Sequence, residues 1–536
     1  MELVPLKASF APSEPVEIAV LGLTGTTLVS LWRLDRKRVE TTVEGLESVV
    51  FDPLPEGGYG VEAVGPDGEF TSTAFDVLAD PLSRPRYGFL AGFEAGRDTA
   101  AVVENARRLH LNAVQFYDWM YRHAQLLPPE DTFCDALGRS LSLSTVRSFA
   151  SALRRAGSLP LGYAAVYAVG REAWPAWETA GLYRPDGTTP WTLGDDFVWL
   201  VDPADERWGE HLGAELEQAL EEVGLAGFHL DQYGWPRRAL RRDLTEVDLA
   251  AAFPHLLSRL RERLPDATLV FNNVNDFPTS ATAGSPQDAV YIEVWPPHEG
   301  LGDLAGLIAK SHALAPDKAT ILAAYQSVYG TSPAEEADRT ARFTMATVFS
   351  RGGFQLLLGE EGALLTGPYY PDHEVLGAGS NEMFRRWYDF VVRHGDLLFD
   401  REAVDVTRSF VGGINESLAI EAPVPVSADP EPRTLWASVI ETRLGTLVHL
   451  VNLGSQTESG WDHPKRPVAP LEGVRLSLLR TAAEPPVFAF GDPDRSPGLE
   501  PLPSANEAAW RDVVELPPLG TWGVVWIRPA TPGLDG

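Results

Sequence analysis

The chain has 536 residues and carries 44 Lys and Arg against 75 Asp and Glu, a formal net charge of −31 at pH 7. So acidic a chain is a poor partner for nucleic acid or for an anionic membrane surface, because both require clustered Lys and Arg. A hydrophobic content of 44% and 15 Trp exclude a disordered chain. At this length, about two to four folded domains are expected.

Cysteine content and hydropathy narrow the class further. Cys134 is the single cysteine, which excludes an internal disulfide and any metal site built from several cysteines. No run of about 18 apolar residues predicts a membrane-spanning helix. Residues Met1 to Pro5 show no basic region followed by an apolar one, so two localisations stay open: cytoplasmic, or secreted with a signal peptide removed. Oligomeric state does not follow from the sequence.

Residues 1–85 alternate short strand-like runs with turns rich in Gly, Pro and Asp. This pattern predicts an N-terminal β-sandwich of the immunoglobulin type, followed by a linker at residues 80–86. The expected strands are Val16–Leu21, Thr27–Arg33, Ser48–Phe51, Gly60–Val64 and Ser72–Val77.

Residues 86–400 alternate apolar runs with amphipathic segments, and there are eight such runs. Eight β–α alternations predict a catalytic (β/α)₈ barrel, although residues 275–289 contain no convincing helix. The expected strands are Tyr87–Phe93, Ala113–Trp119, Leu161–Tyr167, Gly227–Asp231, Leu269–Val274, Val290–Val294, Ile321–Tyr325 and Phe354–Leu358. The clearest expected helices are Ser144–Ala156, Trp208–Val223, Val247–Leu264, Leu304–Leu314 and Pro333–Phe349.

Residues 401–536 return to short strand-like runs and predict a C-terminal β-sandwich of the Greek-key type. The expected strands are Leu435–Ile440, Leu447–Asn452, Val474–Leu479, Val487–Phe490 and Trp522–Ile527. The predicted fold class is therefore a multidomain α/β and all-β chain, with the barrel between two sandwiches.

Functional residues of such a barrel lie at the carboxyl ends of its strands, and two carboxylates stand out there. Asp231 and Glu293 each follow a short apolar strand, where an unpaired carboxylate is costly to bury. Two carboxylates at neighbouring strand ends are what glycoside cleavage requires. Two other interpretations stay open: a hard-cation site formed with Asp118, and structural pairing of the acids with Arg or with a helix N-terminus.

The sequence lacks the motifs of several other classes of enzyme. The sequence has no Gly-Lys dipeptide for a phosphate loop, no His-Glu-x-x-His and no Gly-x-Ser-x-Gly. No cofactor and no bound metal are therefore expected. Trp119, Trp191, Trp235 and Trp295 are residues that could stack on sugars, and Trp295 is the strongest candidate because it lies beside Glu293.

Several separated motifs are similar to those of one known family. They are Gln115 to His123 (QFYDWMYRH), Asp231 to Gly234 (DQYG), Phe271 to Asn275 (FNNVN), Glu293 to Trp295 (EVW) and Tyr369 to Pro371 (YYP). In this order they resemble glycoside hydrolase family 66, which contains endo-dextranases and cycloisomaltooligosaccharide glucanotransferases. The resemblance extends to the order of domains, an immunoglobulin-like domain, a barrel and a β-sandwich.

The resemblance implies a retaining mechanism on α-1,6-linked glucan, a neutral substrate. Asp231 matches the nucleophile, Glu293 the general acid/base, and Asp118 a third acidic residue of the sugar-binding site. Retention implies carboxyl groups about 5–5.5 Å apart, a raised pKa for Glu293 and an ionised Asp231. Further residues predicted to bind substrate are Tyr117, Tyr121, His123, Gln232, Asn272, Trp295 and Gln326.

Two departures from the family pattern bear on specificity. Residues His229, Leu230, Gln232 and Tyr233 around Asp231 differ from the pattern of well-studied dextranases, which leaves the glucan and its chain length open. Cyclising members carry a carbohydrate-binding module inserted in the catalytic region. No insert of that size fits between the strands here, so hydrolysis is favoured, with transglycosylation as a further outcome. An α-galactosidase-like retaining enzyme and a non-catalytic glycan-binding protein are the alternatives.

Overall fold

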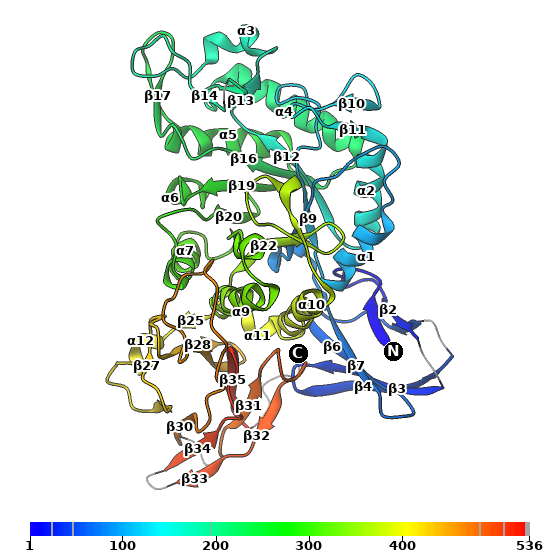
Figure 1. The fold of residues 1–536 in the computed structure, drawn as a ribbon, viewed down its shortest axis with the longest axis vertical. Coiled ribbons are helices and arrows are strands. Elements are labelled where there is room, and N and C mark those ends of the chain that lie inside the picture. Colours follow the sequence, from blue (N-terminus) through cyan, green and yellow to red (C-terminus); the bar gives the residue numbers. More distant parts are fainter. Residues whose placement is uncertain (23–24, 46–47, 195, 482–483, 508–509, 531–536) are drawn as a thin grey trace.

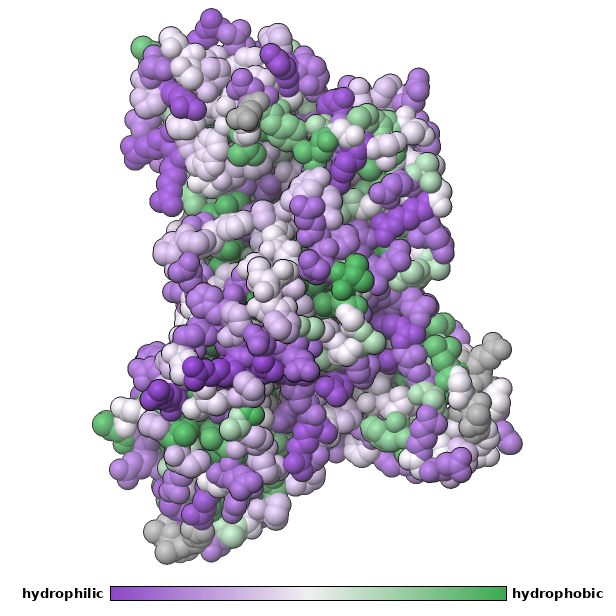
Figure 2. Space-filling view, viewed as in Figure 1, coloured by the Kyte–Doolittle hydropathy of each residue, from purple (hydrophilic) through white to green (hydrophobic). Residues whose placement is uncertain are grey.

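The structure is a computed structural model, in which residues 1–22, 25–45, 48–194, 196–481, 484–507 and 510–530 are described. A closed barrel of parallel strands occupies the middle of the molecule, and antiparallel sheets from the two ends of the chain form two lobes at one end of it (Figure 1). A notch separates these lobes at the surface, where apolar residues are scattered among hydrophilic ones (Figure 2). In the described part of the chain, no helix is both long and apolar enough to span a membrane.

All eight predicted barrel strands are present, and each pairs in parallel with its neighbour. The last strand closes the barrel by pairing with the first, through a register irregularity between Leu356 and Gly359. The eight strands are β8 (Tyr87–Leu90), β9 (Ala113–Phe116), β12 (Leu159–Ala165), β16 (Gly227–Asp231), β19 (Thr268–Val274), β20 (Ala289–Glu293), β21 (Ala319–Ala323) and β22 (Phe354–Gly359).

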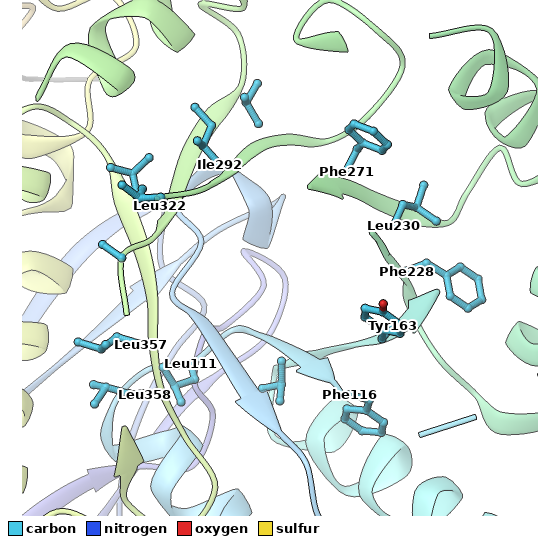
Figure 3. Close-up of a cluster of buried hydrophobic side chains, with 14 of the residues drawn as sticks. Leu111, Phe116, Tyr163, Phe228, Leu230, Phe271, Ile292, Leu322, Leu357 and Leu358 are labelled. Carbon is cyan, nitrogen blue, oxygen red and sulfur yellow. The ribbon is translucent and has the colours of Figure 1, made fainter. Parts of the chain in front are cut away.

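Alternation along these strands separates two apolar cores. One strand face joins the helices in a large cluster, which includes Phe228, Leu230, Phe271 and Ile292 (Figure 3). The other face fills the barrel interior with a second cluster, which includes Tyr87, Leu161, Val270, Tyr291 and Ile321. This alternation directs both His229 and Asp231 of β16 toward the barrel interior.

Helices follow most of the strands, and all five clearest predicted helices are confirmed as α2 (Leu143–Arg155), α4 (Glu206–Val223), α5 (Leu249–Arg263), α7 (Leu301–Leu314) and α9 (Ala334–Ser350). The connection without a convincing helix holds only the four-residue α6 (Thr279–Thr282), where Pro278 precedes a short turn. Further helices are α1 (Ala100–Arg108), α8 (Val328–Thr331), α10 (Ala378–Arg393) and α11 (Gly395–Leu398).

Two segments leave the barrel after β12 and β16 and lie at the end of the molecule opposite the sandwich lobes (Figure 1). They contain small antiparallel sheets that the sequence analysis does not predict, because each strand has only two or three residues. The elements are β13 (Ala168–Gly170), α3 (Trp174–Trp177), β14 (Thr192–Leu193), β15 (Val198–Leu200), β17 (Arg238–Leu240) and β18 (Glu246–Asp248). Two further hairpins are β10 (Thr132–Cys134) with β11 (Ser140–Ser142), and β23 (Ala363–Leu364) with β24 (Glu374–Val375).

The N-terminal lobe is a sandwich of two antiparallel sheets that share one apolar core. One sheet has the order β1 (Glu2–Pro5), β2 (Val16–Leu21) and β5 (Ser48–Phe51), and the other β4 (Arg36–Glu44), β3 (Thr26–Arg33), β6 (Gly57–Val64) and β7 (Phe70–Val77). All five predicted strands are present. β4 escapes prediction because it is an edge strand with mostly exposed, charged side chains, which protect an open edge from pairing with other chains.

The C-terminal lobe also contains two sheets around one core, antiparallel except where β27 pairs with β28, and its five predicted strands are present. The larger sheet has the order β25 (Val404–Asp405), β28 (Leu435–Thr442), β29 (Gly445–Asn452), β35 (Trp522–Arg528), β31 (Val487–Gly491) and β32 (Glu500–Leu502), with β27 (Val426–Ser427) beside β28. The smaller has the order β26 (Leu418–Glu421), β30 (Arg475–Leu479), β34 (Arg511–Glu515) and β33 (Ala505–Glu507). Helix α12 (Thr407–Phe410) precedes β26. Domain limits at residues 85 and 400 stay a prediction.

Buried polar contacts join the N-terminal sandwich to the barrel. Arg86 donates two hydrogen bonds to the Asp76 carboxylate, at 2.6 and 2.9 Å, and both residues are almost fully buried. Asp389 of α10 accepts from the backbone N–H of Ala74 at 3.1 Å and lies 2.7 Å from Nε2 of His110. Because a buried charge without its partner is costly, these contacts fix the sandwich against the barrel.

Candidate active site

A cavity of about 620 Å³ opens at the carboxyl ends of the barrel strands. Eight of the ten predicted site residues line it: Tyr117, Asp118, His123, Asp231, Gln232, Asn272, Glu293 and Trp295. They come from strands β9, β16, β19 and β20 or from the residues that follow them. The barrel therefore brings residues more than 170 positions apart in the sequence to one site.

Asp231 is the last residue of β16, and hydrogen-bond donors hold both of its carboxylate oxygens. The Tyr163 hydroxyl donates to Oδ2 at 2.8 Å, and the Asn272 side-chain amide donates to Oδ1 at 2.7 Å. Tyr163 lies on the neighbouring strand β12, and Asn272 lies on the neighbouring strand β19. The carboxylate is thus fixed from both sides by elements of the barrel itself.

Glu293 ends β20 in the same way and is only 9% exposed. Its Oε1 accepts a hydrogen bond from the Tyr325 hydroxyl at 3.0 Å, and its Oε2 accepts one from Asn272 at 3.0 Å. The Trp295 ring lies edge-on to the Tyr325 ring, with centroids 5.9 Å apart. Aromatic side chains therefore enclose this carboxyl group.

Asn272 bridges the two acids, because one side-chain nitrogen donates to both. That nitrogen lies 2.7 Å from Oδ1 of Asp231 and 3.0 Å from Oε2 of Glu293. These two oxygens can therefore be no farther apart than the sum of the two distances, about 5.7 Å. The other polar atom of the amide, Oδ1, is buried and has no hydrogen-bond partner among the described residues.

Burial raises the pKa of both acids. The pKa of Asp231 rises to about 7, first because of burial and then because of the nearby Glu293 carboxylate. Burial also raises the pKa of Glu293, against the hydrogen bonds from Asn272, Tyr325 and Trp295. A raised pKa for Glu293 agrees with the expectation. The expected ionised Asp231 is opposed by burial and by Glu293, because two like charges this close in a buried site disfavour double ionisation.

Asp118 follows β9 with a left-handed backbone conformation, φ 43°, that directs the chain away from the strand. The Arg139 guanidinium donates to its backbone carbonyl at 2.8 Å. Burial raises the pKa of the Asp118 carboxyl to about 7, while Arg139 and the Tyr117 hydroxyl oppose this rise. Asp118 is thus a third acid with a displaced pKa on the same cavity.

The floor of the cavity is aromatic and uncharged. His229 is 2% exposed and hydrogen-bonds through Nδ1 to the Tyr87 hydroxyl at 3.1 Å. Its ring lies edge-on to Tyr291, with centroids 4.7 Å apart. Burial lowers the pKa of His229 to about 3, so the ring is neutral at every pH at which the acids above it titrate.

The other predicted binding residues differ in what their side chains contact. The Gln232 amide donates to the backbone carbonyls of Asn272 and Phe277 and accepts from the N–H of Gly234, so it holds the loop that follows β16. The His123 ring lies edge-on to Phe197, and burial lowers the pKa of this histidine to about 4. Tyr117 stacks on Tyr370, with centroids 4.4 Å apart.

Two predicted residues lie outside the residues that line the cavity. The Tyr121 ring lies edge-on to Phe133 and has the Arg122 guanidinium 4.1 Å from its centroid. Gln326 is fully buried, and its backbone N–H bonds to the Leu365 carbonyl at 3.1 Å. Neither side chain is among those that line the cavity of the carboxylate pair.

Several lining residues are absent from the sequence-based selection. The tyrosines that hold the acids, Tyr163 and Tyr325, come from β12 and from just beyond β21. A signal for Tyr163 exists, because it lies two residues before the end of a strand and so shares a face with the end. Others lie on the floor or on loops, where no sequence pattern separates them from packing residues: His229, Tyr233, Arg237, Asn275, Tyr291 and Tyr370. Trp235, one of the four Trp that the sequence analysis names as able to stack on sugars, also lines the cavity.

A cation site formed by the acids is the competing interpretation from the sequence. Within the described ranges, no group of three or more His, Cys, Asp or Glu side chains is placed to hold a metal ion. Asp231 and Glu293 instead have their carboxylate oxygens engaged by Tyr163, Asn272 and Tyr325.

A closed (β/α)₈ barrel with two hydrogen-bonded carboxylates at the carboxyl ends of its strands has the groups that glycoside cleavage requires. Comparison with known families gives the particular group. The sequence model of glycosyl hydrolase family 66 matches residues 51–526, and the chain belongs to this family.

Individual relatives share low sequence identity with this chain. A cycloisomaltooligosaccharide glucanotransferase from Niallia circulans is 26% identical over 318 residues, which is 53% of this chain and 32% of that protein. A dextranase from Streptococcus salivarius is 22% identical over 242 residues, 39% of this chain and 29% of that protein. The matched part thus spans about a third of the length of these relatives.

Solved structures share the fold. A Paenibacillus sp. cycloisomaltooligosaccharide glucanotransferase, in complex with cycloisomaltoheptaose, superimposes with a TM-score of 0.88 at 18% identity, covering 98% of this chain and 99% of that chain. The maltogenic α-amylase AmyB from Thermotoga neapolitana gives a TM-score of 0.51 at 10% identity, covering 84% of this chain and 100% of that chain.

Proposed function

We propose that the protein is an endo-acting retaining glycoside hydrolase that cleaves α-1,6-glucosidic linkages of dextran or isomaltooligosaccharides. The observation that carries this proposal is the pair formed by Asp231 and Glu293, bridged by the Asn272 amide inside a cavity at the barrel mouth. Membership in a family of glycosyl hydrolases supports the same chemistry.

The distances support retention rather than inversion. Retaining enzymes have carboxyl groups about 5–5.5 Å apart, whereas inverting enzymes need about 6.5–9.5 Å for a water molecule on the far side of the sugar. The bridging nitrogen limits the facing oxygens of Asp231 and Glu293 to about 5.7 Å. Such a space favours direct attack by a carboxylate on the sugar.

In this mechanism Asp231 attacks the anomeric carbon and forms a glucosyl ester, while Glu293 gives its proton to the departing glycosidic oxygen. Glu293 then takes a proton from water, whose oxygen attacks the anomeric carbon and releases Asp231. The raised pKa of Glu293 keeps its proton bound to a higher pH than that of an exposed glutamate, as a general acid requires. Hydrogen bonds from Tyr163 and Asn272 favour the ionised Asp231 and oppose the effect of its burial.

The α-1,6-glucan substrate is inferred from the relatives, whose names are dextranase and cycloisomaltooligosaccharide glucanotransferase. A glucanosyl transferase is the second candidate. It is favoured by the 26% identity to the Niallia circulans transferase, against 22% to the dextranase. In that reaction a sugar hydroxyl takes the place of water, and the roles of Asp231 and Glu293 stay the same.

Product analysis tests the proposal. We expect dextran to give short isomaltooligosaccharides of several lengths, with the α-anomer formed first in proton NMR of the fresh products. Cyclic products from dextran would identify the transferase. Release of the β-anomer would overturn retention, and cleavage of an α-galactoside without cleavage of dextran would overturn the substrate. A chain that binds dextran but cleaves none of these substrates would be a glycan-binding protein.

A further inference from the structure

A long loop of the C-terminal sandwich reaches the barrel near Glu293. Residues 453–474, all within the described ranges, connect β29 to β30 without a helix or strand of their own. Loops longer than about 15 residues are uncommon and are usually functional. In Figure 1 this loop, in orange, extends from the sandwich to α7, whose first residue Leu301 donates its N–H to the Ser459 carbonyl at 2.8 Å. We call residues 453–474 the sandwich loop.

The sandwich loop binds the segment that follows Glu293 and carries Trp295. The backbone N–H of Trp461 donates to the Glu299 carbonyl at 3.0 Å, and the indole N–H of Trp461 donates to the His298 carbonyl at 2.7 Å. Trp461 is buried, so water does not compete for these two hydrogen bonds. The chain beyond Trp295 is therefore fixed by a residue of another part of the molecule.

Asp462, the next residue, binds the segment that follows β21 and carries Tyr325. Its Oδ2 accepts a hydrogen bond from the Ser327 hydroxyl at 2.5 Å, and its Oδ1 accepts one from the Val328 N–H at 3.1 Å. Val328 begins α8, and Ser327 before it makes no side-chain capping hydrogen bond of its own. Asp462 therefore supplies the cap of α8 from more than 130 positions away in the sequence.

Hydrogen bonds within the sandwich loop hold it in shape. Lys465 is 2% exposed, and its ammonium group donates to the Glu458 carboxylate and to the Gly460 carbonyl. The N–H of Gly460 donates to Glu458 at 2.6 Å. On the barrel side, the Thr344 hydroxyl of α9 donates to the Trp461 carbonyl at 3.0 Å. The sandwich loop thus presents its contacts to the barrel in a fixed geometry.

The two segments that the sandwich loop binds enclose Glu293. The Tyr325 hydroxyl donates to Oε1 of Glu293 at 3.0 Å, and the Trp295 ring lies edge-on to that of Tyr325. Tyr325 lies two residues beyond the end of β21, so the hydrogen bonds of the barrel strands do not extend to it. Both side chains that donate to Asp231, by contrast, lie within barrel strands. The position of Tyr325 thus depends on contacts from outside the barrel strands.

We infer that Asp462 is a positioning residue for catalysis, through which the C-terminal sandwich keeps Tyr325 within hydrogen-bonding distance of Glu293. This inference rests on the proposed roles of Asp231 and Glu293 and adds a role for the C-terminal sandwich. Hydrogen bonds from neighbouring residues orient a catalytic carboxyl group and set its affinity for the proton.

The pH dependence of the carboxylate pair reports this positioning. The titratable groups that face Glu293 are Asp231, Tyr291, Tyr325 and Tyr370. Burial raises the pKa of each of these tyrosines, so of the four groups Asp231 alone titrates near neutral pH. The hydrogen bond from Tyr325 lowers the pKa of Glu293. Loss of that bond should therefore raise the pKa and move the basic limb of the pH profile to higher pH.

Asp462→Ala tests the inference. We expect kcat/KM on dextran to fall about tenfold and its basic limb to move up by about half a pH unit. For a glucoside with a good leaving group, which needs no proton from Glu293, kcat/KM should fall less than about twofold. Asp462→Asn keeps an acceptor oxygen for the Val328 N–H and should retain most of the activity. Glu472→Ala, at an exposed acid of the sandwich loop, is the matched control.

A double-mutant cycle with Tyr325→Phe separates positioning from a general loss of stability. If Asp462 acts through Tyr325, Asp462→Ala should change kcat/KM less than about twofold in the Tyr325→Phe protein. Losses that multiply would overturn the inference, as would an equal fall on good and poor leaving groups with an unmoved basic limb. If Asp462→Ala does not fold, Ser327→Ala takes its place in the cycle, because it removes one of the two hydrogen bonds to Asp462.

A measurement without substrate separates this inference from the proposed function. Carbon NMR of protein labelled at its glutamate carboxyls follows the titration of Glu293, whose signal is identified by its absence in Glu293→Gln. A higher pKa of Glu293 in Asp462→Ala than in the parent protein would support the inference even if neither protein cleaves dextran, a result that would overturn the proposed hydrolysis. An unchanged pKa of Glu293 would overturn the inference at any level of activity.

Discussion

The carboxylate pair and Trp235 line the same cavity but are positioned in different ways. Asp231 and Glu293 end barrel strands, and the hydrogen bonds that hold them come from other barrel strands or from residues directly after them. Trp191 and Trp235 lie on excursions that leave the barrel. The difference teaches that side chains on strands are held in position by the barrel, whereas side chains on loops can change in sequence without disturbing it.

The largest expected effect comes from replacing Asp231, the proposed nucleophile of the carboxylate pair. Asp231→Asn removes the attacking carboxylate while keeping the hydrogen-bonding shape, so we expect kcat on dextran to fall by about 10⁴-fold or more. Binding of dextran should remain, because the aromatic side chains that line the cavity, such as Tyr117, Trp235 and Trp295, are unchanged. Asp67→Asn, on an exposed turn of the N-terminal sandwich, is the matched control. Activity within tenfold of the parent protein would contradict the assignment of Asp231.

Glu293→Gln breaks the other half of the pair and should have the next largest effect. We expect a fall of about 10²–10⁴-fold in kcat/KM on dextran, because the leaving oxygen loses its proton donor. A glucoside with a good leaving group needs no such donor, so its cleavage should be far less affected. Azide should restore turnover of the glucosyl-enzyme, with a glucosyl azide as product. Equal losses on good and poor leaving groups would exclude the acid role, and Glu335→Gln on α9 serves as control.

Asn272→Ala removes the amide that bridges the two acids and leaves both acids in place. We expect a fall of about 10²-fold in kcat/KM, because the amide no longer positions both carboxyl groups. The hydrogen bonds from Asn272 lower the pKa of both Asp231 and Glu293, so their loss should move the acidic limb of the pH profile to higher pH. A slower enzyme with an unchanged acidic limb would show that Asn272 acts on the substrate and not on the acids.

The smallest expected effect is on stability and concerns Asp118. Burial raises its pKa from 3.8 to about 7, so the folded state holds the proton of Asp118 more tightly than the unfolded state does. The contribution of this proton to the free energy of unfolding is fully present below about pH 4 and is lost as pH rises through 7. Asp118→Asn should therefore raise Tm by about 1–3 °C at pH 8 relative to the parent, with no difference near pH 4. Thermal unfolding at several pH values measures this.

Asp186→Asn gives the opposite sign in the same assay. Hydrogen bonds from Thr189 and Thr188 lower the pKa of Asp186, so its contribution is present at neutral pH and is lost in acid. This variant should lower Tm at neutral pH, and the difference should shrink as the pH falls. A rise in Tm at pH 8 for both variants would show a general charge effect and not burial of Asp118.

The barrel could be predicted from the sequence because the same pattern, an apolar run followed by a connection, is repeated eight times. Each strand is a short apolar run, and eight in a row define the topology even where one connection holds only the four-residue α6. The carboxylates Asp231 and Glu293 were accessible because an acid directly after an apolar run is costly and therefore conspicuous. β4 was not accessible, since its charged, exposed side chains give no apolar alternation.

The partners of the acids could not be found in the same way. Tyr163 and Tyr325 contribute one hydrogen bond each, and only the register of β12 with β16 and of β20 with β21 shows which carboxylate each reaches. The raised pKa of Asp231 also required the structure, because it depends on burial and on the position of Glu293. Sequence gives the identity of charged groups, while their ionisation depends on three-dimensional surroundings.

The contact of α10 with the N-terminal sandwich bears on the order in which the chain assembles. Asp389 reaches Thr73 and Ala74 of β7, and Arg393 reaches Glu62 of β6, although more than 300 residues separate them. A ribosome therefore releases the complete sandwich long before it releases the helix that seats it. At about 5–20 residues per second this interval lasts roughly 15–60 s. During that time Glu62, Thr73 and Ala74 are without their partners on α10, so the sandwich and the barrel can join only late in synthesis.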